Sequence, residues 1–269
     1  MTPSSDSPPP PEGRVTVEAD GHVLLIGLDR PAKLNGITPE MLTQLAAAYT
    51  RLERERDLRA GVLFAHGRNF TAGIELPRFA ALMRAGEARF DPALVDPLGV
   101  RGAARTKPLV VGVRGICFTI GIELMLAGDI VVAGHDSRFA QIEVKRGIMP
   151  TGGATFRMVE RAGWGNAQRW LLTGDEFGAD EARRIGFVQE IVPPDQVLAR
   201  CRELAATIAR QAPLAVQASL ASSRRFVEEG PAAAIGEFVQ VQSRLARSED
   251  AAEGVRSFVE RREGRFQGG

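Results

Sequence analysis

The 269-residue sequence contains only two cysteines, three histidines and one tyrosine, and its charges almost cancel. Lys and Arg number 34 against 33 for Asp and Glu, so the net charge of +1 creates no global field for nucleic acid or an anionic membrane. Cys117 and Cys201 do not form a CxxC or metal-ligand spacing, and we expect both to be reduced thiols in the core. We therefore expect no metal site and no nucleic-acid partner.

Long apolar runs are also absent. The longest, Gly115–Gly128, is shorter than the roughly 20 residues that a membrane span needs, and it contains Glu123. Residues 1–13 are rich in Ser and Pro and lack the basic and apolar regions of a secretory signal, so we expect a disordered tail. The sequence thus predicts a cytoplasmic protein without a membrane partner. Its 44% hydrophobic content is enough for a core.

A strand–strand–helix pattern recurs through residues 14–193. Strands are expected at 14–20 and 22–28, around an Asp-Gly turn, and a helix follows Thr38, a favoured N-cap before Pro39. Three repeats of the pattern then follow, with expected elements at 61–65 and 74–83, at 109–113, 114–119 and 120–127, and at 129–133, 137–140 and 154–160. The repeat predicts an α/β fold built from ββα units.

The last third of the chain is mainly helical. Helices are expected at 180–185, 194–211, 213–229, 231–246 and 248–262, with a strand-like stretch at 187–192. From residue 194 onward the apolar faces exceed what a small helical layer buries alone, so we expect 194–269 to be an oligomerisation region. Residues 85–98 interrupt the repeats and are interpreted as a variable loop near a site.

Glu123 is the first candidate for chemistry, because it is the only charged residue between Gly115 and Gly128. Burial disfavours the charged form of a carboxyl, raises its pKa and prepares it for acid–base work near neutral pH. The structural alternative is that Glu123 lies in the first turn of a buried helix, where the helix dipole favours a negative charge.

Glu143 lies beside Lys145 and Arg146, and on its own this pattern favours a surface ion pair. Two other segments, FTAGIEL at 70–76 and TIGIEL at 119–124, place small residues just before a helix. Backbone N–H groups at the start of a helix have no intrahelical partner, so two such ends facing each other would hold an oxygen that becomes negative. Each turn alone is typical of an ordinary structural element.

Together these segments resemble the enoyl-CoA hydratase/isomerase (crotonase) superfamily from about residue 23 to residue 266. The motifs that carry the resemblance are LDRPAKLNGITPEML, LFAHGRNFTAGIEL, KPLVVGVRGICFTIGIELMLAGDIVVAGHDSRFAQIEVKRGIMPTGG, LLTGDEFGADEARRIGFVQEIV and EGVRSFVERREGRF. The resemblance implies a spiral of ββα turns followed by a helical trimerisation region. It also implies a homotrimer or a dimer of trimers that acts on acyl-CoA thioesters, with coenzyme A as part of the substrate and no permanently bound cofactor.

The resemblance also assigns residues. It implies that Glu123 and Glu143 are the catalytic acids of a hydratase and that the N–H groups of Ile74 and Ile120 form an oxyanion hole. Further positions match the family's CoA and substrate contacts, the last three of them in the C-terminal segment that completes a neighbouring site: Lys33, Leu34, Ala72, Leu76, Phe118, Phe258, Arg262 and Phe266.

Because both acids are present, the resemblance favours reversible addition of water to a 2-enoyl-CoA. The alternatives are another reaction on the same scaffold, namely double-bond isomerisation, thioester hydrolysis or carbon–carbon cleavage, and a non-catalytic acyl-CoA-binding homologue. Where the family usually has a glycine, this chain has the β-branched Ile120, whose side chain is expected to restrict the acyl group.

Overall fold

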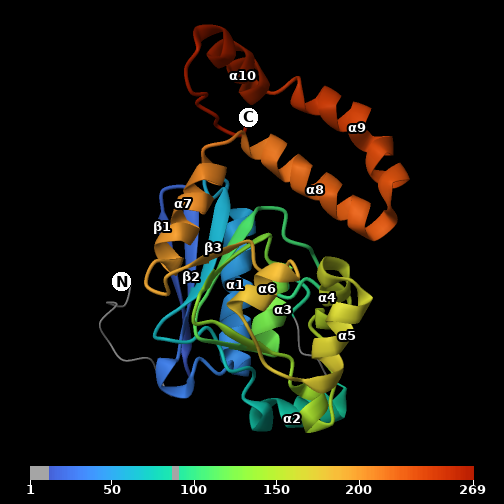
Figure 1. Cartoon of the computed structure of the whole chain (residues 1–269). Helices are drawn as coiled ribbons and strands as arrows, with labels where there is room; N and C mark the ends of the chain where they lie inside the picture. Colours follow the sequence, from blue (N-terminus) through green and yellow to red (C-terminus); the bar gives the residue numbers. More distant parts are fainter. Residues whose placement is uncertain (1–11, 87–90) are drawn as a thin grey trace.

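The computed structural model describes residues 12–86 and 91–269, so most of the expected tail and four residues of the expected loop at 85–98 lie outside the described residues. The described chain is a mixed α/β structure in which two sheets are followed by a helical region (Figure 1). No helix among the described residues is long and apolar enough to cross a membrane.

The larger sheet has six strands in the order β1-β2-β3-β4-β6-β9. Strands β1 and β2 pair antiparallel and the others pair parallel. The smaller sheet has the order β5-β7-β8, and its first two strands are parallel. The strands are β1 (Arg14–Asp20), β2 (Val23–Asp29), β3 (Ala60–Ala65), β4 (Leu109–Val113), β5 (Ile116–Phe118), β6 (Ile130–Gly134), β7 (Arg138–Ala140), β8 (Phe177–Gly178) and β9 (Glu190–Val192).

The helices are α1 (Pro39–Arg54), α2 (Leu76–Ala85), α3 (Ile120–Ala127), α4 (Ala154–Ala162), α5 (Trp164–Thr173), α6 (Ala179–Arg184), α7 (Val197–Ala209), α8 (Pro213–Glu229), α9 (Pro231–Leu245) and α10 (Glu249–Glu260), with 3-10 turns η1 (Pro31–Lys33) and η2 (Glu143–Arg146). The hydroxyl of Thr38 accepts a hydrogen bond from the N–H of Met41 at 3.2 Å, which confirms the expected N-cap of α1.

The ββα repeat expected from the sequence is confirmed. Each complete unit sends one strand to the large sheet and the next to the small sheet before its helix: β4, β5, α3 and then β6, β7, α4. In the preceding unit a bridge between Thr71 and Cys117 takes the place of the small-sheet strand. This arrangement stacks the ends of successive units side by side, so that residues far apart in the sequence meet where the small-sheet strands end.

The central strands of the large sheet are apolar on both faces because both faces are covered. One face packs with α1 and α3 in the main core, and the other packs against α7. Residues on the α7 side include Val23, Leu25, Val62, Val110 and Val132 of the sheet and Val197, Cys201, Ala205 and Ala209 of α7. Cys117 and Cys201 are both buried free cysteines, as expected from the sequence.

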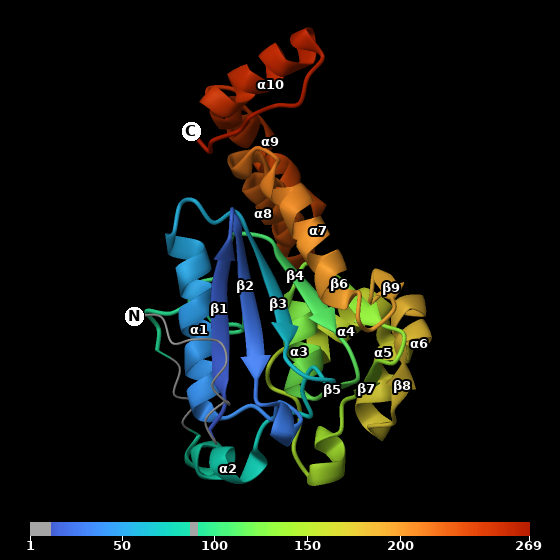
Figure 2. The same ribbon diagram turned by 90° about the vertical axis from the view of Figure 1, so that its left-hand side faces the viewer.

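The helical region was expected from residue 194. Its first helix in the structure, α7, begins at Val197 and packs against the sheet. Helices α8, α9 and α10 extend away from the sheet at one end of the molecule, whereas α2 lies at the opposite end (Figure 2). Arg224 of α8 donates a hydrogen bond to Asp129 Oδ1 at 3.1 Å, which ties this arm to the core.

Candidate active site

Glu123 lies in the first turn of α3 and is 4% exposed. Its Oε1 accepts hydrogen bonds from the N–H groups of Gly152 at 2.6 Å and Ala154 at 3.3 Å, where α4 begins. The carboxylate therefore satisfies backbone donors of the neighbouring helix, a partner that the sequence did not reveal. A Cβ atom on Gly152 would stand 2.5 Å from Glu123 Oε2, so glycine is required for this approach.

Glu143 is the first residue of η2 and is 8% exposed. Gln141 Nε2 lies 3.4 Å from Glu143 Oε1, while Oε2 is buried without a hydrogen-bond partner among the described residues. The surface ion pair that the local sequence favours is not observed, because Lys145 is exposed and lies 3.8 Å from Asp175 instead. Glu143 is therefore a buried acid with one unpaired oxygen among the described residues.

Burial raises the pKa values of both acids. For Glu123 the N–H groups of Ala154 and Gly152 and the charge of Arg157 oppose this rise. For Glu143 burial raises the pKa to about 7, its own backbone N–H lowers it, and the charge of Glu123 raises it further. The charge of Glu123 is one cause of the raised Glu143 pKa, so the two carboxyl groups lie close enough to interact. The backbone hydrogen bonds favour the charged form of Glu123, whereas burial is the largest influence on Glu143.

The two expected oxyanion donors lie on neighbouring segments. The N–H of Phe118 donates to the carbonyl of Thr71 at 3.0 Å, so the segment leading to Ile74 runs beside the end of β5 that leads to Ile120. Ile120 is the first residue of α3, so its N–H has no intrahelical acceptor. Neither Ile74 nor Ile120 donates a backbone hydrogen bond within the described part of the chain.

The side chain of Ile120 is 6% exposed and belongs to the main core. The volume of this residue is therefore part of the hydrophobic packing around α3. We expect truncation of Ile120 to act on stability, at about 2–5 kcal/mol for a large-to-small core change. Restriction of the acyl group by Ile120 stays a prediction.

Asn35 and Thr71 hold the loops around the site, and the sequence analysis missed both. The amide of buried Asn35 donates to the carbonyls of His66 and Asn69, each at 2.8 Å, and its oxygen accepts from the N–H of Arg30. The Thr71 hydroxyl donates to the Asn35 carbonyl at 2.7 Å and accepts from the N–H of Gly73. The signal that could have found Asn35 is an amide in the LNG turn directly before the α1 cap.

Five of the expected CoA and substrate contacts lie on segments near the two oxyanion residues. Lys33 ends η1 and is exposed, Leu34 follows it with φ 51°, and the Leu34 carbonyl accepts from the N–H of Ala72 at 3.0 Å. Leu76 begins α2 two residues after Ile74. Phe118 is half-buried at the end of β5. The described chain thus brings these contact residues close to the two segments that end in Ile74 and Ile120, which together are called the oxyanion segment.

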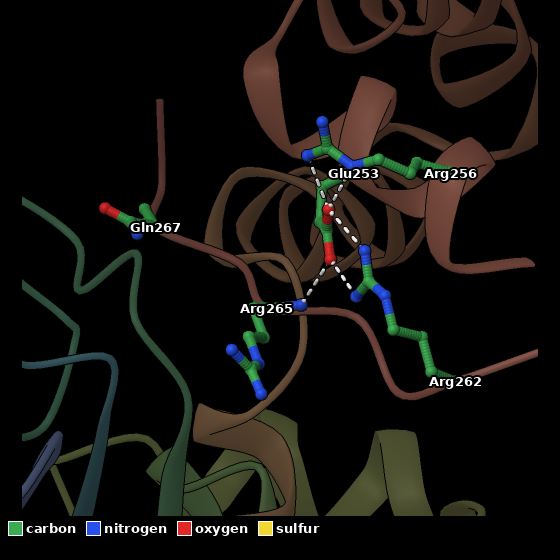
Figure 3. Close-up of a pocket in the computed structure, with 5 residues that line it drawn as sticks. All are labelled: Glu253, Arg256, Arg262, Arg265 and Gln267. Carbon is green, nitrogen blue, oxygen red and sulfur yellow. Dashed lines mark hydrogen bonds and ion pairs between the residues drawn. The ribbon is translucent and has the colours of Figure 1, made fainter. Parts of the chain in front are cut away.

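The three C-terminal residues are not brought to this site by the same chain. Phe258 lies in α10 and Arg262 follows that helix, in the arm at the end of the molecule opposite α2 (Figure 1). Figure 3 shows Arg262 directed at Glu253, with Nη1 2.5 Å from Glu253 Oε1, in a cavity of about 410 Å³ that contains neither catalytic candidate. Phe266 packs near Gly254 of α10, and Phe258 is 84% exposed.

No group of three or more His, Cys, Asp or Glu side chains that suits a metal ion occurs within residues 12–86 and 91–269. Among the described residues, the site combines two buried carboxyl groups with the backbone N–H groups of Ile74 and Ile120, which donate no backbone hydrogen bond. A carbonyl oxygen that accepts a hydrogen bond from both N–H groups would develop negative charge at low cost in free energy. The carboxyl groups would then exchange protons with the carbons next to it.

Comparison with known proteins gives one consistent result. The profile of a family described as enoyl-CoA hydratase/isomerase matches residues 18–269. An enoyl-CoA hydratase, EchA19, from Mycobacterium tuberculosis is 35% identical over 257 residues, covering 93% of this chain and 95% of that protein. A 2,3-dehydroadipyl-CoA hydratase from Escherichia coli is 32% identical, covering 94% of this chain and 98% of that protein. A crystal structure of a probable enoyl-CoA hydratase/isomerase from Mycobacterium abscessus superposes with a TM-score of 0.91 at 48% identity, covering 94% of this chain and 97% of that one.

Proposed function

This chain belongs to the enoyl-CoA hydratase/isomerase family, and we propose that it catalyses the reversible addition of water to a 2-enoyl-CoA thioester. The observation that carries the proposal is the pair of buried carboxyl groups, Glu123 and Glu143, whose charges repel each other. Hydration needs one group that takes a proton from water and another that gives a proton to carbon, and this pair supplies both.

The charge that develops during hydration falls on the thioester oxygen. When water attacks the β-carbon, the electrons of the double bond move toward the carbonyl and form an enolate. The unpaired N–H groups of Ile74 and Ile120 would stabilise that oxygen, and Ile120 adds the positive end of the α3 dipole. The site therefore provides the electrostatic stabilisation that this intermediate needs.

The surroundings of the two acids suggest separate roles. Glu123 accepts two backbone hydrogen bonds, which favour its ionised form, so it acts as the base that orients and deprotonates the water. Glu143 has a pKa of about 7 and an unpartnered oxygen, so it holds the proton that is delivered to the α-carbon. The oxygen of water bonds to the β-carbon, Glu123 takes one proton, and Glu143 gives one. A proton then passes back from Glu123 to Glu143.

Binding of coenzyme A uses the loops beside the oxyanion segment. We assign Lys33, Leu34 and Ala72 to the path of the adenosine and pantetheine groups, because the hydrogen bond between Leu34 and Ala72 joins these loops at the site. Leu76, at the start of α2, continues this path, and Phe118 borders the reacting end. Phe258 and Arg262 belong to the α10 end of the arm, and Phe266 borders a cavity at the β1–β2 turn that contains neither catalytic candidate. These three residues would therefore complete the site of a neighbouring subunit in a trimer or a dimer of trimers.

The first prediction tests the two acids. Glu123→Gln and Glu143→Gln each keep the shape of the side chain and remove its proton transfer, so each should lower kcat for hydration about a hundredfold or more. The measurement is the rate of water addition to a short 2-enoyl-CoA, with products identified by mass and by comparison with a 3-enoyl-CoA substrate.

Glu18→Gln is the control, because Glu18 is exposed on β1. It should keep the wild-type rate. Wild-type hydration in either acid variant would overturn the assignment. Conversion of the 3-enoyl-CoA without net water uptake would identify an isomerase, and tight acyl-CoA binding without any turnover would identify a non-catalytic homologue.

A further inference from the structure

One hydroxyl at the site has no hydrogen-bond partner. Thr119 Oγ1 is buried and unpaired among the described residues, although buried polar atoms in proteins are nearly always paired. Two further side-chain oxygens, on Gln141 and Glu143, are also buried and unpartnered among the described residues, and both residues come just after β7. All three follow the ends of the paired strands β5 and β7, so the unpaired atoms mark the region where a ligand is expected.

The backbone of Thr119 has an unfavourable conformation. Its φ of 51° and ψ of −116° lie where a β-branched residue is rarely found and glycine is favoured. The structure holds this conformation on both sides, because the N–H of Thr119 donates to the Ala140 carbonyl at 3.0 Å and its carbonyl accepts from Ile122. A strained backbone of this kind, held in place by its neighbours, points to a functional role.

The hydroxyl of Thr119 does not cap its helix. Thr119 is the N-cap residue of α3, and a threonine at that position normally accepts a hydrogen bond from a backbone N–H of the first turn. No such side-chain bond forms here, because φ and ψ differ from the extended values of an N-cap. The hydroxyl is therefore directed elsewhere.

The hydroxyl faces the other half of the oxyanion segment. A Cβ atom added to Gly73 would meet Thr119 Oγ1 at 2.5 Å, so the hydroxyl lies directly against Gly73. Gly73 precedes Ile74, and Thr119 precedes Ile120. The hydroxyl thus belongs to the residue before Ile120 and lies against the residue before Ile74.

We propose that the Thr119 hydroxyl is a third hydrogen-bond donor to the thioester oxygen, beside the N–H groups of Ile74 and Ile120. The proposal rests on the proposed function, since it assumes that the ligand is a CoA thioester. A bound oxygen would also give the buried hydroxyl the partner that it lacks, and the hydroxyl keeps its proton throughout.

The test measures polarisation of a bound thioester separately from turnover. The absorption band of an aryl-conjugated 2-enoyl-CoA, such as cinnamoyl-CoA, moves to longer wavelength when its carbonyl accepts stronger hydrogen bonds. Thr119→Val keeps the β-branched shape and removes the hydroxyl, so the shift should shrink and kcat/KM for hydration should fall roughly tenfold. Thr119→Ser restores the hydroxyl and should recover most of both values.

Thr43→Val is the matched control, because Thr43 is an exposed threonine of α1 whose hydroxyl bonds to the Pro39 carbonyl. It should leave the band shift and the hydration rate unchanged. Thermal unfolding shows whether each variant is folded. If Thr119→Val does not fold, Thr119→Ala removes the hydroxyl with less crowding and takes its place.

The outcomes separate the two proposals. If Thr119→Val polarises the thioester and hydrates it as the wild type does, the hydroxyl only fills space and the inference is overturned, while the proposed function stands. If the wild type polarises the thioester but does not hydrate it, the hydratase assignment fails and the donor role of Thr119 is still decided by the band shift. If the wild type neither binds nor polarises the thioester, both proposals are wrong.

Discussion

Glu143 is the residue whose proton we expect to respond most directly to pH. Burial raises its pKa to about 7, so its acid form is lost as pH rises through that value. Because the proposed mechanism needs this proton, kcat/KM for hydration should fall above about pH 7. A pH profile of kcat/KM checks this, and the Glu143→Gln profile should lack the same limb. A wild-type rate that stays constant up to pH 9, well above the raised pKa of about 7, would contradict the assigned role.

The same shift of the Glu143 pKa affects stability. Between its ordinary value of 4.5 and about 7 the folded state holds a proton that the unfolded state has lost, so the free energy of unfolding decreases as pH rises through this window. Below this window both states are protonated, so this group no longer changes the free energy of unfolding with pH and its contribution is fully present. The Tm of Glu143→Gln should therefore gain on the wild type as pH rises from 4.5 to 7.

Sequence reasoning could identify one of the two acids from the residues alone. Glu123 is conspicuous because it is the single charge in an apolar run, and the structure confirms its burial. Glu143 is followed closely by Lys145 and Arg146, which suggest a surface position, and its burial results from the η2 turn, which directs both cations to solvent. A turn of this kind leaves no periodic pattern, so only the resemblance to a family identified Glu143.

At the scale of elements, the contact between α3 and the start of α4 decides where the Glu123 carboxylate lies. Gly152→Ala would place a Cβ 2.5 Å from Glu123 Oε2 and 3.0 Å from a methyl group of Leu98. We expect the carboxylate to move, hydration to fall about a hundredfold, and stability to drop by about 1–3 kcal/mol from overpacking. Steady-state kinetics and thermal unfolding measure both effects.

Gly165→Ala provides the matched control for this substitution. Gly165 lies in α5, and a Cβ there would meet nothing within 4 Å. Alanine in a helix is favoured over glycine by about 0.5–1 kcal/mol, so this variant should be as stable as the wild type or more so, with unchanged kinetics. Equal kcat in Gly152→Ala and Gly165→Ala would show that the carboxylate position does not depend on this contact.

Elements with a clear local signal were predicted well. The bounds of β1, β4, α3 and α8 agree with those expected, because turn residues or prolines mark their ends. Helix α5 was missed. It begins directly after Gly163, whose φ of 75° ends α4 and starts α5 at once, and no element was expected between residues 160 and 180. The contact of Glu123 with Gly152 was invisible as well, because 29 residues separate the two partners.

At the scale of the whole molecule, the arm formed by α8–α10 exposes many large apolar side chains. They are Phe226, Val227, Ile235, Phe238, Val239, Val255, Phe258 and Val259, all at least half exposed. A water-soluble monomer rarely exposes so much apolar surface in one region. This supports the proposed assembly, in which another copy of the chain covers the arm.

We expect the protein to be a trimer or a hexamer by light scattering at micromolar concentration. Val239→Glu places a charge on a side chain that is 81% exposed in the single chain, so burial of that charge in the interface should shift the assembly toward monomers. Val17→Glu, on β1 and 36% exposed, is the control and should leave the mass unchanged. A wild-type monomer would contradict the proposed assembly.

The position of α7 has a consequence for biosynthesis. This helix covers the second face of the large sheet, yet it follows all nine described strands in the order of translation. While the ribosome is still adding the residues of α7, the nascent chain carries Val62, Val110 and Val132 on a sheet face without its cover. Partly made chains with such a surface aggregate readily. Release of a finished molecule therefore depends on a late docking event, and chaperones that shield apolar surface would act during that interval.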